Sequence, residues 1–523
     1  MTLDLANLPD DLSLLKQIVA DLAAALQDRD ALLKELEHQL AVLRRHQFGR
    51  KSEKIDAAQL LLAFAGLEDA EPQAPPPPPN KRAKRKGHGR KPLPEDLPRE
   101  RIEHDLAPDA KHCDKCGAAL TKIGEDVTRQ LDYVPASLVV REHARAKYAC
   151  PQCEETVVVA PLPPQPIEKG LPGAGLLAHV LVSKYADHLP LHRQERIFKR
   201  HGVELSRSTL CNWVRDCATL LNPIVAAMTR QVLASTRIHT DDTPVPVRDR
   251  LYPKATRTGR FWVYRGDDAH AYTIFDYTPT RKRDGPVRFL DGYKGYLQAD
   301  AFTGYDGIYA GGQVTEVACW AHARRKFFEA SNTDRERAHT ALAFIGQLYD
   351  IERQARDDEL DAEARGKLRT AHARPVLEQF RRWLDAQALA TVPKSPIGGA
   401  IGYALGQWTA LCRYLDDGDL EIDNNAAERA LRRIAVGRKN WLFAGNDNGG
   451  HRAAIIYSLI ATCQRHGVEP FAYLRDVLGR VATHPSSGIA VLLPDNWKAA
   501  QAAIVANAQH SQPSPLTPAP ATA

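Results

Sequence analysis

An acidic residue, Glu428, stands among basic residues in the segment 421–450. Asp423 or Asn424 can cap the first turn of a helix there, and apolar residues recur behind the cap at helical spacing. The basic residues are Arg429, Arg432, Arg433, Arg438 and Lys439. Because a carboxylate can hold a divalent cation and Arg and Lys bind phosphate, the segment indicates chemistry on nucleic acid. In an isolated helix the same residues would form a solvated face on which Glu428 pairs with Arg432.

Two further carboxylates are expected beside Glu428. The stretches 237–249, 261–265, 271–279 and 295–300 are rich in β-branched or aromatic residues, which predicts strands. Asp241 is predicted to end the first strand and Asp300 a later one, so that neighbouring strands of a mixed sheet bring both to the helix with Glu428. Taken singly, each Asp would be an ordinary turn residue or cap.

Three converging carboxylates repel one another unless a cation binds, and hard divalent cations such as Mg²⁺ favour oxygen ligands. Two such ions, roughly 4 Å apart, would activate the attacking oxygen and stabilise the leaving oxygen of an in-line phosphoryl transfer. The three acids therefore predict metal-dependent chemistry on a phosphodiester.

Two pairs of cysteines have the spacing of zinc knuckles. Cys113 and Cys116 form one Cys-x-x-Cys motif, and Cys150 and Cys153 form the other. Four thiolates complete a closed tetrahedral site, so the segment 101–165 is predicted to be a zinc ribbon. Buried free thiols or a redox motif are the alternatives.

The segment 166–230 reads as helical and resembles a helix-turn-helix at its centre. One helix should end near His201, Gly202 should make the turn, and a second helix should open at Ser206 or Ser208. The second helix would offer four side chains to a DNA groove: Arg207, Ser208, Thr209 and Asn212. A helical hairpin with a Gly turn and no DNA contact is the alternative.

The N-terminal segment 1–67 carries a leucine-zipper pattern. Aliphatic residues alternate at steps of three and four from Leu12 to Leu43, and only Arg29 breaks the seam. Such a seam predicts a coiled coil that joins copies of the chain into a homo-oligomer. The basic stretch 44–54 that follows could contact phosphate or solvate the helix end.

A linker is predicted at 68–100, where a proline run precedes a basic tract without aromatic residues. Candidate phosphate contacts in this tract are Lys81, Arg82, Lys84, Arg85 and Lys86. The end of the chain, 506–523, has the composition of a disordered tail.

Composition narrows the class of protein. A chain of 523 residues with 44% hydrophobic residues is long enough for several domains, and its net charge of +6 is concentrated in basic clusters that suit DNA or RNA. The sequence shows no apolar run of membrane-spanning length and no secretory signal at its acidic N-terminus. Nine cysteines in such a chain favour reduced thiols and a metal, so a cytoplasmic protein is expected.

Four motifs in order, HTDDTP, LQADAFTGYD, CWAHARRKFFEA and DNNAAERALRRIAVGRKNWLFAG, resemble the DDE transposases of the insertion sequence 66 family. The resemblance covers nearly the whole chain. It implies an RNase H-like catalytic core at 231–465 whose acidic triad is Asp241, Asp300 and Glu428, with Mg²⁺ or Mn²⁺ as cofactor. Where the family often reads Asp-Glu-Thr, this chain has Asp242 as its second residue, which makes Asp242 a rival for the first acid.

The resemblance also implies a basic motif that could hold DNA near the site, formed by His322, Arg324, Arg325 and Lys326. The strongly helical stretch at about 331–418 is interpreted as an insertion into the core, and 466–505 as a C-terminal helical segment. The expected fold class is therefore multidomain α+β, with a coiled coil, a zinc ribbon, a helix-turn-helix-like domain and a mixed α/β core.

The expected function is that of a bacterial transposase that binds the ends of an insertion sequence and cleaves and transfers DNA strands. It would be associated with the nucleoid when bound to DNA, and accessory proteins of the same element are candidate partners. Two alternatives remain open: a noncatalytic DNA-binding regulator, and a nuclease without strand transfer.

The zinc ribbon makes a direct prediction. Each chain should bind one zinc ion, and Cys150→Ser should abolish this binding because a closed structural site needs all four ligands. Metal analysis of protein purified without chelators tests this, with Cys211→Ser, outside both motifs, as the control that keeps its zinc. Wild-type protein without zinc would refute the assignment.

Overall fold

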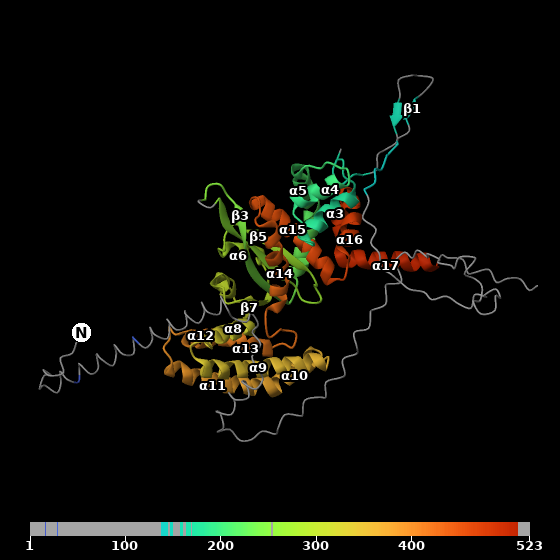
Figure 1. Cartoon of the computed structure of the whole chain (residues 1–523). Coiled ribbons are helices and arrows are strands. Elements are labelled where there is room, and N and C mark those ends of the chain that lie inside the picture. Colours follow the sequence, from blue (N-terminus) through green and yellow to red (C-terminus); the bar gives the residue numbers. More distant parts are fainter. Residues whose placement is uncertain are drawn as a thin grey trace, which may run out of the picture. The chain divides into compact units, whose positions relative to one another are not determined.

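The computed structural model describes residues 138–144, 147–149, 157–159, 164–168, 170–252 and 255–510, together with Lys16 and Arg29. At its centre is a five-stranded mixed sheet in the order β5-β4-β3-β6-β7 (Figure 1). The strands are β3 (Arg237–Arg248), β4 (Thr256–Arg265), β5 (Thr273–Thr278), β6 (Gly295–Gln298) and β7 (Val314–Val317). The pairs β3–β4 and β4–β5 are antiparallel, whereas β3–β6 and β6–β7 are parallel. The four strands predicted from the sequence are therefore present, and β7 is an addition.

Strand β3 corrects one expectation, because it does not end at Asp241 but continues to Arg248. Its parallel pairing with β6 stops at His239, while its antiparallel pairing with β4 runs on to the end. Pro244 and Pro246 are tolerated in this extension because residues at even positions turn their backbone groups away from β4. The neighbouring Arg248 N–H accordingly donates to the Ala444 carbonyl at 2.9 Å.

Two helices, α14 (Asn425–Trp441) and α15 (Asp447–Arg465), cover one face of the sheet. Tyr457 of α15 packs edge-on against Phe261 of β4, and the Ser458 hydroxyl accepts from the Phe275 N–H at 2.8 Å. Short elements cover the other face: α6 (Asp284–Phe289), η2 (Thr303–Tyr305) and α7 (Asp306–Tyr309). There the Phe289 ring stacks on that of Tyr264 with centroids 3.6 Å apart.

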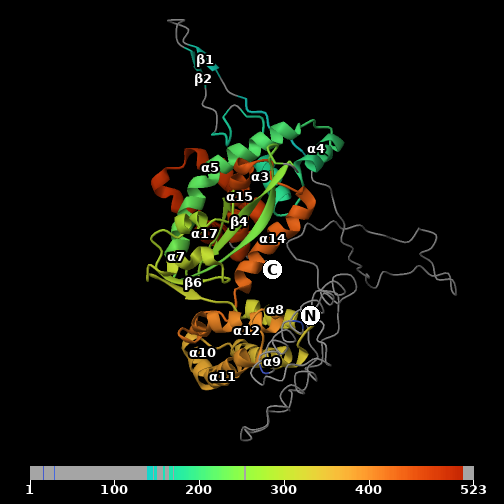
Figure 2. The same ribbon diagram turned by 90° about the vertical axis from the view of Figure 1, so that its left-hand side faces the viewer.

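A second helical layer packs beyond α15 (Figure 2). It consists of α3 (Ala174–Tyr185), α4 (Leu191–Arg200), α5 (Arg207–Leu233), α16 (Pro470–Arg480), η5 (Val481–Thr483), η6 (Ser486–Leu492) and α17 (Pro494–His510). Its buried residues form one hydrophobic core with those of the sheet. The segment predicted to resemble a helix-turn-helix thus shares the core of the sheet.

The predicted helical turn between α4 and α5 is confirmed. Gly202 has a φ of +78°, a conformation that glycine adopts readily, and the Ser206 hydroxyl accepts from the Thr209 N–H at 3.1 Å as an N-cap. Leu210 and Trp213 point into the core, as their helical spacing predicts.

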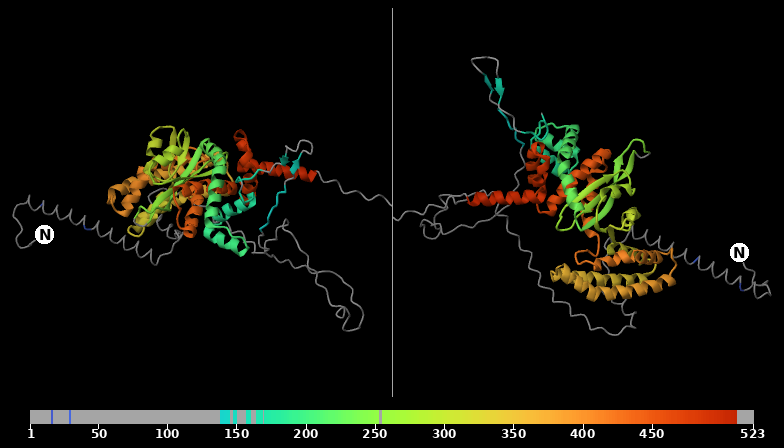
Figure 3. Two further views of the ribbon diagram at one scale, coloured as in Figure 1. Left: turned by 90° about the horizontal axis from the view of Figure 1, so that it is seen from above. Right: turned by 180° about the vertical axis from the view of Figure 1, so that it is seen from behind.

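The segment between β7 and α14 forms a helical bundle with a core of its own (Figure 3). Its elements are α8 (Trp320–Ala330), α9 (Arg335–Asp357), α10 (Ala362–Leu368), η3 (Arg369–Ala373), α11 (Arg374–Ala390), α12 (Pro396–Gly406), α13 (Trp408–Cys412) and η4 (Arg413–Leu415). Arg369 is fully buried, pairs with Glu352 at 2.7 Å, and donates to the Leu420 carbonyl at 2.8 Å. This one side chain therefore ties the bundle to the segment that leads into α14.

The remaining sequence predictions are only partly covered by the structure. Strands β1 (Lys147–Ala149) and β2 (Val157–Val159) pair antiparallel around the second cysteine pair. The four cysteines, the basic tract from Lys81 to Lys86 and the zipper lie outside the described residues, apart from Lys16 and Arg29, which are helical. Helix α17 runs to His510, so the first residues assigned to the disordered tail are helical. Among the described residues, no helix is long and apolar enough to cross a membrane.

Candidate active site

Asn424, the residue before α14, fixes this helix against β3. Its side chain is fully buried, donates to the Thr240 carbonyl at 2.8 Å and lies 3.1 Å from Nδ1 of His239. Burial lowers the pKa of His239 to about 4, so this imidazole is neutral at pH 7. Asn424 is the N-cap residue but makes no capping bond with its side chain, and the carboxylate of the preceding Asp423 accepts from the Asn425 N–H at 3.0 Å.

Glu428 lies in the first turn of α14, one turn beyond Asn424. Alternate strand residues point to the same face, so Asp241 shares the face of β3 on which His239 meets Asn424. Helix α14 therefore places Glu428 near Asp241. Among the ion pairs of the described residues, Glu428 has His322 of α8 as its partner, at 3.7 Å, and not Arg432.

Asp241 is a half-buried carboxyl without a basic partner among the described residues. Burial raises its pKa to about 7, and the negative charges of Asp300, Asp242 and Glu428 act in the same direction. The Asp242 N–H donates to Asp241 at 2.7 Å and offsets only part of this rise. The electrostatic influence of Asp300 and Glu428 on Asp241 indicates that the three predicted acids lie near one another.

Asp242 points to the opposite face of the sheet and is neutralised there. Its side chain is 2% exposed and receives hydrogen bonds from Arg260 and Arg281, each at 2.8 Å. Arg281 also reaches Asp300, at 3.4 Å, and lies over the Phe302 ring at 4.3 Å. Burial raises the pKa of Asp300, against the opposing effects of Arg281 and His322. Among the described residues, Asp242 therefore has two arginine partners, whereas Asp241 has no basic partner.

The donor set suits a hard divalent cation, because it consists of carboxylate oxygens and leaves the charge of Asp241 uncompensated. Among the residues that the structure describes, no three His, Cys, Asp or Glu side chains are arranged so that they could hold a metal ion. The ion pair between Arg281 and Asp300 engages one of the three acids. A metal would compete with Arg281 for this carboxylate.

The predicted DNA contacts of α14 divide into two groups. Arg429, Arg432 and Lys439 are exposed. Arg433 bonds to Gln464 and Arg438 to Thr243, so these two also hold the helix in place.

The other predicted contacts in the described residues are accessible to different degrees. On α8, Arg325 and Lys326 are exposed and Arg324 is half-buried, and Lys326 lies over the Tyr403 ring at 4.7 Å. On α5, Arg207, Ser208 and Asn212 are exposed while Thr209 is half-buried.

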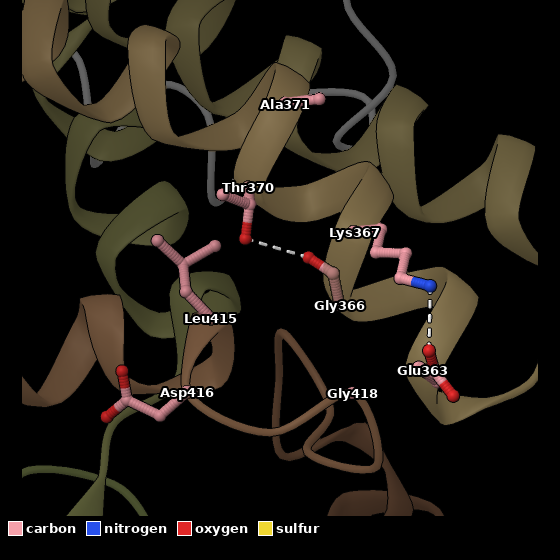
Figure 4. Close-up of a pocket in the computed structure, with 8 residues that line it drawn as sticks. All are labelled: Glu363, Gly366, Lys367, Thr370, Ala371, Leu415, Asp416 and Gly418. Carbon is pink, nitrogen blue, oxygen red and sulfur yellow. Dashed lines mark hydrogen bonds and ion pairs between the residues drawn. The ribbon is translucent and has the colours of Figure 1, made fainter.

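A hollow of about 490 Å³ lies in the helical bundle, away from the acids (Figure 4). Lys367 and Glu363 on its rim pair with each other at 2.7 Å, and Thr370 bonds to the Gly366 carbonyl. The hollow contains none of the predicted site residues.

Three residues of the site have contacts in the structure that the sequence did not predict. Arg260 and Arg281 neutralise Asp242, and Asn424, considered only as a cap, joins α14 to β3. A signal existed for Arg281, which opens the basic run Arg281-Lys282-Arg283 directly after a predicted strand. The contact of Asn424 depends on residues almost two hundred positions away and has no local signal.

Comparison with known protein families gives four matches along the chain. The model described as "Transposase IS66 family" matches residues 169–452, which include the sheet, the bundle and the three acids. "Transposase C of IS166 homeodomain" matches residues 35–102, and "zinc-finger binding domain of transposase IS66" matches residues 110–154. "IS66 C-terminal element" matches residues 458–494.

The chain is also similar to three uncharacterized proteins of Sinorhizobium fredii. It is 37% identical to y4hP, over 80% of this chain and 79% of the relative. It is 33% identical to y4jD, over 96% and 99% of the two chains, and 33% identical to y4qI, over 95% and 99%.

The unbalanced charge of Asp241 predicts an unusual pH dependence. Without added Mg²⁺ or Mn²⁺, Asp241→Asn should raise the free energy of unfolding at pH 8, and this gain should shrink towards pH 5. The pKa of Asp241 is about 7 in the folded protein and about 3.9 in an unfolded chain, so the folded state binds more protons between these values. Wild-type stability should therefore fall as the pH rises through this window, by a few kcal/mol at most, since one pKa unit corresponds to about 1.4 kcal/mol.

The matched control is Asp242→Asn, which leaves Arg260 and Arg281 without their carboxylate and should lower stability at pH 8. Urea denaturation of both variants at pH 5 and pH 8 measures the difference. A loss of stability for Asp241→Asn at pH 8 equal to that for Asp242→Asn would contradict this description of the site.

Proposed function

The chain belongs to the IS66 family of transposases, and from this premise we propose that it binds the ends of an insertion sequence and catalyses metal-dependent cleavage and transfer of DNA strands. The catalytic residues in this proposal are Asp241, Asp300 and Glu428. The observation that carries it is the contrast between two neighbouring acids: Asp241 is desolvated and faces further carboxylates, while Asp242 is neutralised by Arg260 and Arg281.

The fold of the catalytic segment is proposed to be RNase H-like. In support, β3, β4 and β5 form an antiparallel meander, and β6 and β7 extend the sheet with parallel pairing on the other side of β3. The bundle between β7 and α14 then counts as an insertion between the second and third acids of the triad.

Asp241, Asp300 and Glu428 would hold Mg²⁺ or Mn²⁺. When bound, such ions activate an attacking oxygen and stabilise the leaving oxygen of a phosphodiester. Asp241 must lose its proton before it can act as a ligand, so metal affinity should rise as the pH increases through about 7. His322 lies against Glu428 and would hold this carboxylate in place beside β3.

Basic side chains around the acids would hold the DNA backbone. Arg429, Arg432 and Lys439 project from the helix that carries Glu428, and Arg325 and Lys326 from α8. The exposed residues at the start of α5 provide a separate contact. These contacts should weaken with added salt, because each phosphate contact releases counterions.

The N-terminal segments complete the proposal. The zipper would join copies of the chain so that two DNA ends are held together, a structural Zn²⁺ would hold the ribbon, and the protein would be associated with the nucleoid when bound to DNA. Accessory proteins of the same element remain candidate partners.

Glu428→Gln should abolish strand cleavage and leave DNA binding nearly intact. The amide is close in size but is a weaker metal ligand, and the surrounding arginines remain to meet phosphate. Asp241→Asn and Asp300→Asn should have the same effect, and Asp242→Asn a much smaller one. Cleavage and joining of a labelled duplex bearing the element's ends, with and without Mg²⁺, and a mobility shift at fixed salt measure both properties.

Glu421→Gln is the control, because this exposed acid precedes the same helix and should remain active. Near-normal cleavage by Glu428→Gln would overturn the triad. Wild-type protein that binds the ends without cutting them would favour a noncatalytic regulator, and cutting without joining would favour a nuclease.

A further inference from the structure

A second hollow, of about 280 Å³, lies between α3, α5, β4 and the loop that joins α14 to α15. Five of its fifteen lining residues are aromatic: Tyr185, Phe261, Trp441, Phe443 and Tyr457. A space of this size with aromatic walls suits a flat ring, because ring faces stack over one another with little loss of contact. The hollow contains none of the acids of the proposed catalytic site.

Two cations line the same hollow, Lys184 and Arg452. Neither has a carboxylate partner among the ion pairs of the described residues. Lys184 is half-buried, its ammonium group lies 5.1 Å from the centre of the Tyr185 ring, and burial lowers its pKa. Unpaired cations beside apolar walls suit a ligand that is anionic at one end and aromatic at the other.

Buried polar atoms on the Trp441 side also lack full hydrogen bonding. The indole N–H of Trp441 approaches the Tyr457 hydroxyl but makes no hydrogen bond of ordinary geometry in the described part of the chain. Nδ1 of His188 is likewise buried without a partner there, and both atoms face Gly437. Neither His188 nor Gly437 lines the hollow, so these two atoms do not contribute to the contact with a ligand.

The loop at the mouth of the hollow holds apolar side chains out to solvent. Leu442 has a φ of +66°, which L residues rarely adopt, and is 62% exposed, while Phe443 is 41% exposed. The next residue, Ala444, is fixed to β3 by hydrogen bonds of 2.9 Å to Pro246 and Arg248. A strained, anchored loop that presents Leu442 can act as a wedge between stacked rings.

The hollow and the proposed catalytic acids share one helix. Trp441 is the last residue of α14 and Glu428 lies in its first turn, so the two positions are about 20 Å apart along the helix. At 3.4 Å per nucleotide this corresponds to about six base-pair steps of DNA. Arg432 and Lys439 are exposed and lie between Glu428 and Trp441 along this helix.

We propose that this hollow binds one unstacked nucleotide of the DNA substrate, with its base between the aromatic side chains and its phosphate at Lys184 and Arg452. Leu442 and Phe443 separate this base from its neighbour. The inference rests on the proposed action on DNA and adds a nucleotide-binding site to it, about six base pairs from the point of cleavage.

Photocrosslinking of the full-length protein tests this inference. 5-Iodouracil replaces single bases at successive positions on either side of the cleavage point in a duplex bearing the element's ends, and irradiation links an iodinated base to an aromatic ring stacked on it. One position, about six base pairs from the cut, should give an adduct on Trp441, Phe443 or Tyr185. Adducts confined to other segments, with an intact mobility shift, would overturn the inference.

Variants measure the contribution of the hollow to binding. Phe443→Ala should abolish this adduct and weaken binding about ten-fold, since stacking on one aromatic side chain carries an effect of this order. Leu389→Ala removes an equally apolar side chain, 93% exposed on α11, and should bind normally. Lys184→Gln should weaken binding and flatten its salt dependence, while Lys394→Gln, on the exposed surface of the bundle, should do so less. Equal affinities for Phe443→Ala and Leu389→Ala would contradict the proposal.

Cleavage of the unmodified duplex by wild-type protein with Mg²⁺ is measured in parallel. Cleavage without an adduct in the hollow rejects the nucleotide site and leaves the proposed function standing. An adduct without cleavage supports the site and rejects the catalytic assignment. Absence of both rejects both.

Discussion

The arrangement of this site depends on one buried amide. Asn424 has no access to solvent and bonds to both Thr240 and His239 of β3, so α14 can start at only one position along this strand. Leaving either partner without its hydrogen bond would carry the cost of a buried unsatisfied polar group, on the order of 1–3 kcal/mol. Everything further along α14 follows from this starting point. Arg438 bonds to Thr243, and the loop after the helix joins the end of β3. Near the start of the helix, the charge of Glu428 acts on Asp241.

The two neighbouring acids, Asp241 and Asp242, have different electrostatic surroundings. Asp242 faces away from α14 and is held by Arg260 and Arg281, so its charge is already compensated. Asp241 faces α14 and has no ion-pair partner among the described residues, and its partial burial together with the charges of Asp300, Asp242 and Glu428 disfavours its ionisation. The alternation of side chains along a strand separates these environments although the residues are adjacent. This physical difference supports the choice of Asp241 as a ligand.

Local patterns in the sequence predicted the elements well and their contacts poorly. The strands, the Gly202 turn and the apolar stripe of α14 follow from short-range rules, and each is present, although β4 begins earlier than expected and β6 ends at Gln298 and not at Asp300. Asp241 was wrongly expected to end its strand, because β3 continues alone on one side after β6 stops, which no local pattern reveals. The neutralisation of Asp242 and the docking of Asn424 join residues distant in the chain. The hollow likewise gathers residues from α3, α4, α5, β4, α14 and α15 and has no motif of its own.

Iron-directed cleavage of the polypeptide tests most directly whether the acids brought together by α14 hold a metal. Fe²⁺ replaces Mg²⁺ in oxygen sites, and with ascorbate and peroxide it generates hydroxyl radicals that cut the nearest backbone. In the presence of end-bearing DNA, the account predicts cuts near Asp241, Asp300 and Glu428 that disappear together in Asp241→Asn and persist in Asp242→Asn. Cuts that avoid these three positions, or that are unchanged in Asp241→Asn, would contradict it.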